Sequence, residues 1–117
     1  MSNKIWKVGL VGAGGIGPTH LWALSQIPEL ARLTAVCARH LDRAKRLADP
    51  LGAASFTSTR QMVEEGDVDA VIVATPHMWH EEPTMTALKA GKPTIVEKPL
   101  AATCAVCDRL IAQAKAS

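Results

Sequence analysis

Five short apolar runs alternate with five longer amphipathic runs, and no other feature of the sequence constrains the fold as strongly. The short runs are rich in Val, Ile, Leu and Ala, which suits strands buried on both faces of a sheet. The predicted strands are residues 7–11, 33–37, 54–56, 70–74 and 94–96, and the predicted helices are residues 16–26, 41–48, 59–65, 82–90 and 103–116. This alternation predicts an α/β fold: a doubly wound parallel sheet of about five strands with helices on both faces.

The length of 117 residues suits one domain, and we expect a single domain over residues 1–117. Hydrophobic residues make up 48% of the chain and charged residues 21%, as in soluble globular proteins. The net charge of +2 gives no field that would attract nucleic acid or an anionic membrane. The longest apolar run, residues 70–74, is far too short to span a bilayer.

A glycine-rich hexamer, GAGGIG, stands directly between the first predicted strand and the first predicted helix. In this position it indicates a dinucleotide site of the Rossmann type. Gly12 would permit a tight turn, Gly14 would let the backbone approach a pyrophosphate, and Gly17 would let the helix pack close to the strand. Free N–H groups at the helix start, near Gly15 and Ile16, would bind the phosphate charge. A glycine-rich turn that binds nothing is the alternative.

The residues after the second predicted strand indicate which dinucleotide would bind. NAD sites usually place an acid there to hold the ribose 2′-hydroxyl, but this strand is followed by Ala38 and Arg39. Ala38 leaves room for a 2′-phosphate, and Arg39 could pair with that phosphate or stack on adenine. Arg43 could reach the same anion. We therefore predict NADP, with NAD as the alternative if both arginines are ordinary surface charges.

The segment after the fourth predicted strand should lie over the same edge of the sheet, where open α/β folds bind ligands. We expect Thr75, Pro76 and His77 to line the cofactor cleft. His77 and His80 stand beside two glutamates, but no motif supplies the further ligands that zinc usually needs, so we predict no metal site. His80 would begin the next helix or line the nicotinamide pocket. Trp79 would cover the nicotinamide ring or simply pack.

The fifth predicted strand runs into Glu97, Lys98 and Pro99, and Lys98 would sit where a reacting carbon meets the nicotinamide. An ammonium group there can stabilise an alkoxide that develops during hydride transfer, and an amine could act as a general base. Glu97 could anchor the loop or orient Lys98. A surface Glu–Lys pair at a strand end is the alternative, and position alone does not separate the two.

The glycine hexamer, residues 74–76 with His80, and residues 97–99 occur in order after the first, fourth and fifth strands. Together they resemble the Gfo/Idh/MocA oxidoreductases, the family of glucose–fructose oxidoreductase and inositol dehydrogenase. The resemblance covers essentially the whole chain, and its specific part is the E-K-P motif. It implies that Lys98 lies at the nicotinamide and takes part in catalysis or substrate binding, and that the Lys98–Pro99 bond is cis. It further implies NAD- or NADP-dependent oxidation or reduction of hydroxyl and keto groups on sugars, cyclitols and related small molecules.

The sequence departs from the family pattern in three ways. His77 stands where Asn is frequent, and no acid follows the second strand, which agrees with NADP. Family members also carry a C-terminal substrate domain with most substrate contacts and usually a catalytic His or Asp, and we expect that domain to be absent here. The isolated chain should therefore bind cofactor without meaningful turnover. The uncovered sheet edge after the fifth strand should favour self-association, so we expect a homo-oligomer.

Three cysteines do not form a disulfide framework, and no basic segment followed by an apolar stretch opens the chain, so we expect the cytoplasm. Cys104 and Cys107 have C-x-x-C spacing near a helix start, where thiols can be redox-active. We favour a plain amphipathic helix packed on the sheet.

Two other functions compete with the oxidoreductase. The chain could be a stand-alone module that binds or senses a nucleotide without turnover, and length does not separate these two. It could also be a structural domain with an empty cleft, against which the glycine hexamer argues.

Overall fold

The computed structural model describes residues 4–76 and 79–117. Its strands are β1 (Trp6–Val11), β2 (Ala31–Cys37), β3 (Ala54–Phe56), β4 (Ala70–Val73) and β5 (Thr94–Val96). Its α-helices are α1 (Gly17–Ser25), α2 (Leu41–Ala48), α3 (Thr59–Glu65), α4 (Glu81–Lys89) and α5 (Cys104–Ala116). The predicted alternation is confirmed. Strand β2 begins two residues earlier than predicted because Ala31 already pairs with Trp6 of β1, and a short 3₁₀ helix, η1 (Asp49–Leu51), follows α2.

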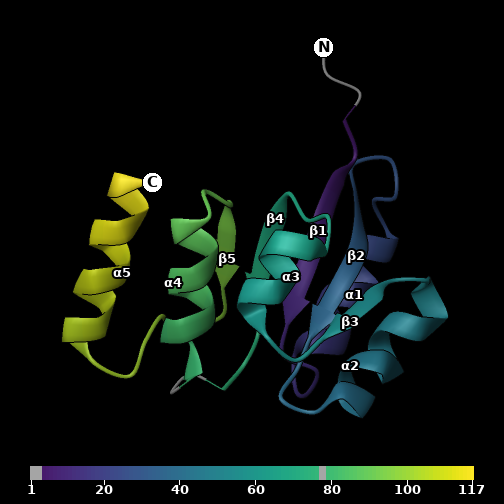
Figure 1. The fold of residues 1–117 in the computed structure, drawn as a ribbon, viewed down its shortest axis with the longest axis horizontal. Coiled ribbons are helices and arrows are strands. Elements are labelled where there is room, and N and C mark those ends of the chain that lie inside the picture. The colour runs from purple at the N-terminus through teal and green to yellow at the C-terminus, as the bar shows by residue number, and fades with distance from the viewer. Residues whose placement is uncertain (1–3, 77–78) are drawn as a thin grey trace.

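All five strands are parallel, in the order β3-β2-β1-β4-β5 (Figure 1). The chain steps outward from β1 to β3, then crosses back to lay β4 on the other side of β1. The sheet is therefore doubly wound, as predicted, and its strand order reverses between β1 and β4. A crevice forms beyond the carboxyl ends of the strands at such a reversal, and ligands bind there in this class of fold.

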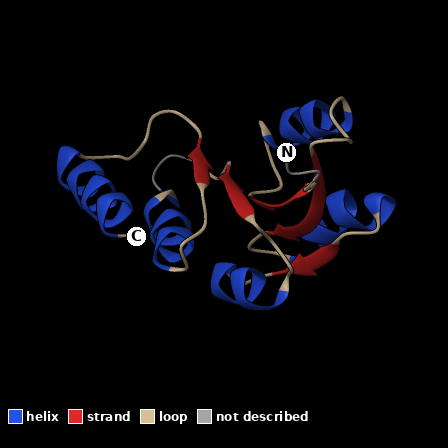
Figure 2. Cartoon of the chain, turned by 90° about the horizontal axis from the view of Figure 1, so that it is seen from above, coloured by secondary structure: helices blue, strands red, loops and turns tan. Residues whose placement is uncertain are grey.

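Helices cover both faces of the sheet (Figure 2). Successive side chains of β1 point to opposite faces, so Leu10 packs with Leu24 of α1, whereas Val11 packs in a cluster that includes Met62 of α3 and Ala87 of α4. Helix α2 lies over β2 and β3 through a third small cluster. Leu10, Met62 and Ala87 are fully buried, and this two-sided burial explains why the strands read as near-continuous apolar runs.

Helix α5 packs against α4 rather than on the sheet, which corrects the prediction for the C-x-x-C helix. It lies outermost in the fold, beyond α4 (Figure 1). Arg109 of α5 places its Nε 2.9 Å from Oε2 of Glu81 on α4, and Leu110 is the buried apolar contact of α5. Helix α4 already covers the sheet beside β4 and the three-residue strand β5, so α5 has no sheet surface left on that face. Cys104 is exposed and Cys107 is half-buried.

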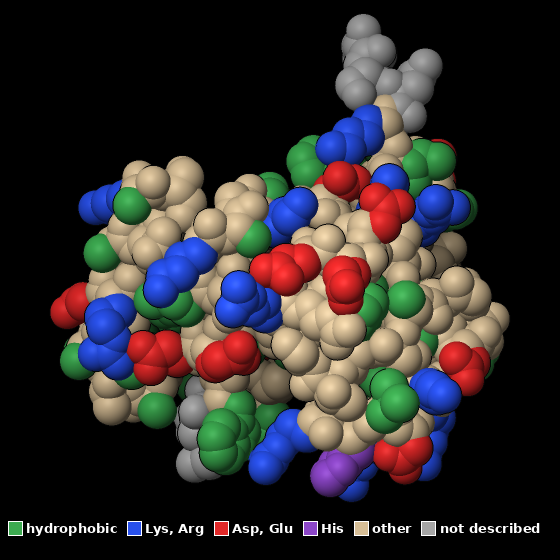
Figure 3. Space-filling model, viewed as in Figure 1, with side chains coloured by type: hydrophobic (Ala, Val, Ile, Leu, Met, Phe, Trp, Pro, Cys, Tyr) green, Lys and Arg blue, Asp and Glu red, His purple; other side chains and the backbone are tan. Residues whose placement is uncertain are grey.

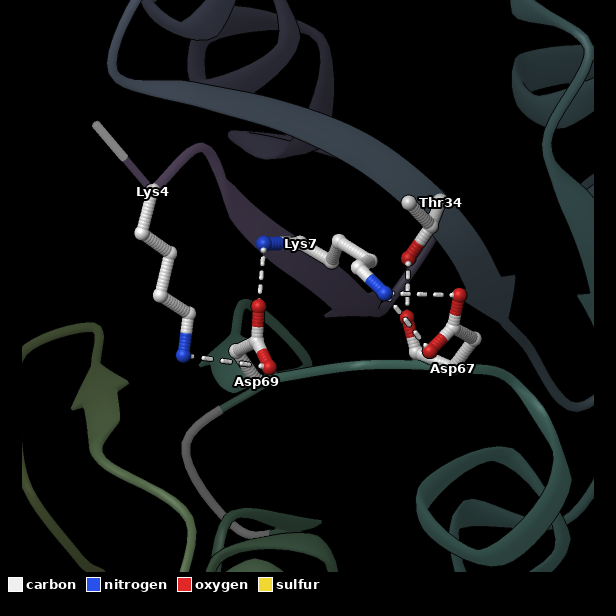
Figure 4. A network of polar contacts seen from close by, with 5 residues as sticks. All are labelled: Lys4, Lys7, Thr34, Asp67 and Asp69. Carbon is white, nitrogen blue, oxygen red and sulfur yellow. Dashed lines mark hydrogen bonds and ion pairs between the residues drawn. The ribbon is translucent and has the colours of Figure 1, made fainter. Parts of the chain in front are cut away.

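A polar network joins the start of β1, the middle of β2 and the segment that precedes β4 (Figure 4). The backbone N–H of Lys7 donates to Oδ2 of Asp69 at 2.9 Å, and the N–H of Asp69 donates back to the Lys7 carbonyl at 2.6 Å. The Lys7 ammonium lies 2.9 Å from Oδ1 of Asp67, and the Thr34 hydroxyl donates to the Asp67 carbonyl. The hydrogen bond from the Lys7 backbone, together with the nearby charge of Lys4, lowers the pKa of Asp69.

The charged side chains are mixed in sign. Lys and Arg are interspersed with Asp and Glu on the face shown in Figure 3, in keeping with the net charge of +2. Among the helices that the structure describes, none combines the length and the hydrophobicity needed to cross a membrane.

Candidate functional site

A cleft of about 560 Å³ lies at the carboxyl edge of the sheet. Its walls are formed by the segments that follow β1, β2, β4 and β5, and the lining residues are Ala13, Gly14, Gly15, Ile16, Ala38, Arg39, His40, Arg43, Ala74, Thr75, Pro76, Trp79, Glu97 and Lys98. Most residues predicted to contact the cofactor are therefore gathered in one place. Gly12, Gly17 and His80 lie outside this lining, and His77 lies outside the described residues.

Gly12 makes the turn after β1 possible through both its conformation and its packing. Its φ is +111°, which side chains strongly disfavour, and its N–H donates to the Cys37 carbonyl at 2.8 Å. A Cβ at this position would lie 2.7 Å from the backbone carbon and oxygen of Ala74. At Gly17 a Cβ would lie 3.0 Å from the Gly12 carbonyl oxygen. Because neither glycine has a side chain, α1 and the end of β4 can pack close to the turn that forms one wall of the cleft.

The middle of the glycine turn is open toward the cleft. A Cβ at Gly14 or Gly15 would meet nothing within 4 Å. No hydrogen bond among the described residues takes up the backbone N–H groups of Gly14, Gly15 or Ile16. Free N–H groups at the start of a helix attract anions, since the positive end of the helix dipole lies there as well. The turn therefore presents unbonded N–H groups and open space at one wall of the cleft.

The β2 side of the cleft carries two cations. Ala38, Arg39 and Arg43 line the cleft, and Ala38 is buried and contributes only a methyl group. Trp79 lies against Arg39, with the guanidinium carbon 5.2 Å from the ring centroid. The structure thus places Trp79 beside a residue that follows β2, and its predicted role as a cover for the nicotinamide stays a prediction. Glu97 is the one acidic residue in the described lining of the cleft.

A second hollow of about 540 Å³ shares Ala38, Arg39, Thr75, Pro76 and Trp79 with the cleft. It continues toward the carboxyl ends of β2 and β3 and is lined by further polar groups and a thiol, Thr57, Ser58, Thr59, Glu82 and Cys37. Burial raises the pKa of the Cys37 thiol, so this cysteine stays protonated at neutral pH and is a poor nucleophile. The hollow therefore offers space and hydrogen-bonding groups rather than reactivity.

His80 is buried and lies outside the lining of the cleft. Its side chain is 1% exposed. Nε2 lies 2.8 Å from the Thr75 carbonyl and Nδ1 lies 3.1 Å from the Leu100 carbonyl, so the ring joins the segment after β4 to the segment before α5. It also stands at the N-cap of α4, as one of the two predictions for this residue had it. No group of three His, Cys, Asp or Glu side chains within residues 4–76 and 79–117 could hold a metal ion.

Lys98 projects from the segment after β5 and is exposed in the cleft. The Lys98–Pro99 peptide bond is cis, as the family resemblance implied. In the described part of the chain Lys98 has no hydrogen-bonding or ionic partner. Glu97 extends the sheet by donating its N–H to the Val73 carbonyl, and its carboxylate Oε1 lies 2.6 Å from Nε2 of His20 on α1.

The sequence analysis did not predict His20, which contacts Glu97, or three residues that line the cleft, Ala13, His40 and Ala74, as site residues. His20 is separated from Glu97 by 77 positions, and nothing in the sequence pairs the two. Its one indirect signal is its position within the first turn of α1, the helix that the glycine hexamer already ties to the cleft.

Comparison with known proteins decides the family. Residues 6–117 match the Gfo/Idh/MocA family model, described as an oxidoreductase family with an NAD-binding Rossmann fold. The chain belongs to the Gfo/Idh/MocA family. It is 36% identical to an inositol 2-dehydrogenase of Klebsiella pneumoniae over 90% of this chain and 32% of that protein. Against inositol 2-dehydrogenase 4 of Saccharopolyspora erythraea the identity is 41%, over 86% of this chain and 30% of that protein.

Solved structures of a dehydrogenase and a ketoreductase superpose closely on the chain. The WlbA dehydrogenase of Bordetella pertussis, solved with NADH and UDP-GlcNAcA, has a TM-score of 0.91 at 27% identity, over 97% of this chain and 35% of that one. KijD10, a 3-ketoreductase of Actinomadura kijaniata solved with NADP and TDP-benzene, has a TM-score of 0.87 at 36% identity, with the same coverage. The chain thus spans about a third of the length of the proteins it matches.

Proposed function

We propose that this chain is the dinucleotide-binding domain of an NADP-preferring oxidoreductase that acts on a hydroxyl or keto group of a sugar, cyclitol or related small molecule. The observation that carries the proposal is the pairing of an open glycine turn with two arginines and no acid on the β2 side of one cleft. Relatives named inositol 2-dehydrogenase and a 3-ketoreductase solved with NADP support the substrate class and the cofactor.

The two ends of the cleft suit the two ends of a dinucleotide. The unbonded N–H groups of the glycine turn would hold the pyrophosphate. Arg39 and Arg43 would hold the 2′-phosphate, since a guanidinium can donate two parallel hydrogen bonds to a phosphate. Trp79 restrains Arg39 at this end, and the second hollow gives the adenine ring room beside them.

The reactive end would lie near Lys98, on the β5 side. A bound nicotinamide would supply the carbon that accepts or donates hydride. The ammonium of Lys98, without a partner in the described part of the chain, would stabilise the oxygen of the substrate as negative charge develops on it. That ammonium would form when the neutral amine of Lys98, the candidate base that this chain provides, accepts the hydroxyl proton during oxidation, and it would return the proton during reduction.

Calorimetric titration of the 117-residue chain with NADPH and with NADH tests the proposal. We expect NADPH to bind more tightly. Arg39→Ala should weaken NADPH binding about 10- to 100-fold, which corresponds to the loss of one charge-assisted interaction, and should leave NADH binding within about threefold of the wild type. Arg46→Ala is the matched control, because Arg46 lies on the same helix as Arg43 but outside the cleft. Equal losses for both dinucleotides after Arg39→Ala would remove Arg39 as a 2′-phosphate ligand.

A stand-alone binding or sensing module is the second candidate. It is favoured by the cleft, which contains groups for a whole dinucleotide but a single candidate catalytic side chain, Lys98. Comparison of the mass of the purified protein with its coding sequence would show whether more chain belongs to the natural protein. Turnover of a cyclitol or sugar by the natural protein would exclude the module.

A further inference from the structure

The contact between His20 and Glu97 joins the two halves of the cleft. His20 stands near the start of α1, whose preceding turn provides the free N–H groups, and Glu97 immediately precedes Lys98. Nε2 of His20 and Oε1 of Glu97 are 2.6 Å apart, and the two side chains are 19% and 29% exposed. A carboxylate only accepts hydrogen bonds, so the imidazole N–H is the donor. At this distance and degree of burial the contact restrains both side chains.

Glu97 is thereby fixed at two points. Its backbone N–H pairs with Val73 of β4, and its carboxylate is held by α1. Both constraints act on the residue next to Lys98, so they define the direction in which the chain leaves the sheet.

The same contact separates two charges that would otherwise attract each other. Glu97 and Lys98 both line the cleft, so a carboxylate released from His20 could turn within the cleft toward the neighbouring ammonium. An ammonium paired with a carboxylate is held in place and keeps its proton more firmly than a solvated one. In the structure Glu97 is bonded to His20, and Lys98 has no ionic partner among the described residues.

We propose that His20 is a positioning residue that holds the Glu97 carboxylate away from Lys98 and so keeps the Lys98 ammonium available in the cleft. The catalytic use of Lys98 rests on the proposed function, but the contact by which His20 holds Glu97 away from Lys98 does not. His20 touches neither substrate nor cofactor in this proposal and acts through Glu97.

The test compares how fast Lys98 reacts in variants of the 117-residue chain. Trace acetylation with N-acetoxysuccinimide at constant pH, read by mass spectrometry of the Lys98 peptide, reports the availability of its amine, and exposed Lys115 on α5 serves as the internal reference. His20→Met keeps the bulk of the side chain but removes the donor, whereas His20→Gln keeps an N–H donor. Thermal unfolding of each variant checks that the fold is retained.

We expect His20→Met to slow acetylation of Lys98 about threefold or more relative to Lys115, because the released carboxylate pairs with the ammonium. His20→Gln should react close to the wild-type rate. Adding Glu97→Gln to His20→Met should restore the rate, since the amide carries no charge. His40→Met is the matched control, because His40 lines the cleft on the α2 side and contacts neither Glu97 nor Lys98 in the described structure, and it should leave the rate unchanged.

An unchanged rate in a folded His20→Met variant overturns the proposal, as does a slowed rate that Glu97→Gln does not restore. If His20→Met does not fold, the acetylation rate of Lys98 in the wild type is compared with that in Glu97→Gln. The two rates should agree, because a carboxylate held by His20 does not affect Lys98. NADPH titration of the wild type is read separately. If NADPH does not bind but the acetylation rates are as expected, the proposed function is refuted and the role of His20 stands. If NADPH binds but the acetylation rates are not as expected, the role of His20 is refuted and the proposed function stands.

Discussion

Replacement of Gly12 by alanine should destabilise the domain sharply, and the structure sets the size of the effect. The residue would have to hold φ at +111°, which costs a non-glycine residue about 1–2 kcal/mol. Its Cβ would also lie 2.7 Å from two backbone atoms of Ala74. Backbone cannot rotate away as a flexible side chain can, and such overpacking costs about 1–3 kcal/mol more. The expected loss of unfolding free energy is therefore about 2–5 kcal/mol, or a fall in Tm of roughly 8–20 °C.

Gly14→Ala is the matched control in the same turn. Nothing lies within 4 Å of a Cβ at Gly14 and its φ is not positive, so Tm should stay within about 3 °C of the wild type. The added methyl group would instead stand where the backbone has to approach a pyrophosphate, and NADPH binding should fall about 100-fold or more. Thermal unfolding by circular dichroism and calorimetric NADPH titration measure the two quantities. An unchanged Tm for Gly12→Ala, or an equal fall for both variants, would refute the assignment of packing to Gly12 and of ligand approach to Gly14.

Two further predictions concern stability. The pKa of Asp69 is lowered in the folded state, so this carboxylate stabilises the fold at neutral pH, and the contribution disappears as pH falls through that pKa, below about 4. Urea unfolding at pH 7 and at pH 3 should therefore show that Asp69→Asn loses less unfolding free energy in acid than the wild type does. Equal losses for the two proteins would contradict this prediction. The Thr84 hydroxyl is buried without a partner in the described part of the chain, so Thr84→Val should raise the unfolding free energy by about 1–2 kcal/mol, measured by the same urea titration, and a decrease would show that the hydroxyl is bonded.

The extent of agreement between sequence and structure follows from the range of the interactions involved. Helix and strand periods are properties of neighbouring residues, so the elements begin and end within two residues of the predicted positions. The glycine hexamer is equally local, because a tight turn with positive φ at Gly12 depends on a few successive residues. Because a helix connects each strand to the next, the strands run parallel, and the sheet brings the ends of β1, β2, β4 and β5 to one edge.

Contacts between distant segments were not predictable in the same way. The sequence left two predictions for His80, and only the structure places it at the N-cap of α4, buried between the Thr75 and Leu100 carbonyls. The sequence left Trp79 either over the nicotinamide or simply packed, and it gave no sign of the contact between its ring and Arg39. In both cases the outcome depends on how loops from different strands meet.

The sequence by itself determined the order of strands and helices, the glycine turn, and the edge of the sheet where the cleft would form. It also placed Arg39 and Lys98 on that edge, because each is the second residue after a strand. Only the tertiary structure decided that α5 packs on α4 and that His20 holds Glu97 across 77 positions. The physical reason is that backbone conformation is set by local sterics and periodicity, whereas the meeting of two side chains depends on crossovers and packing that involve the whole chain.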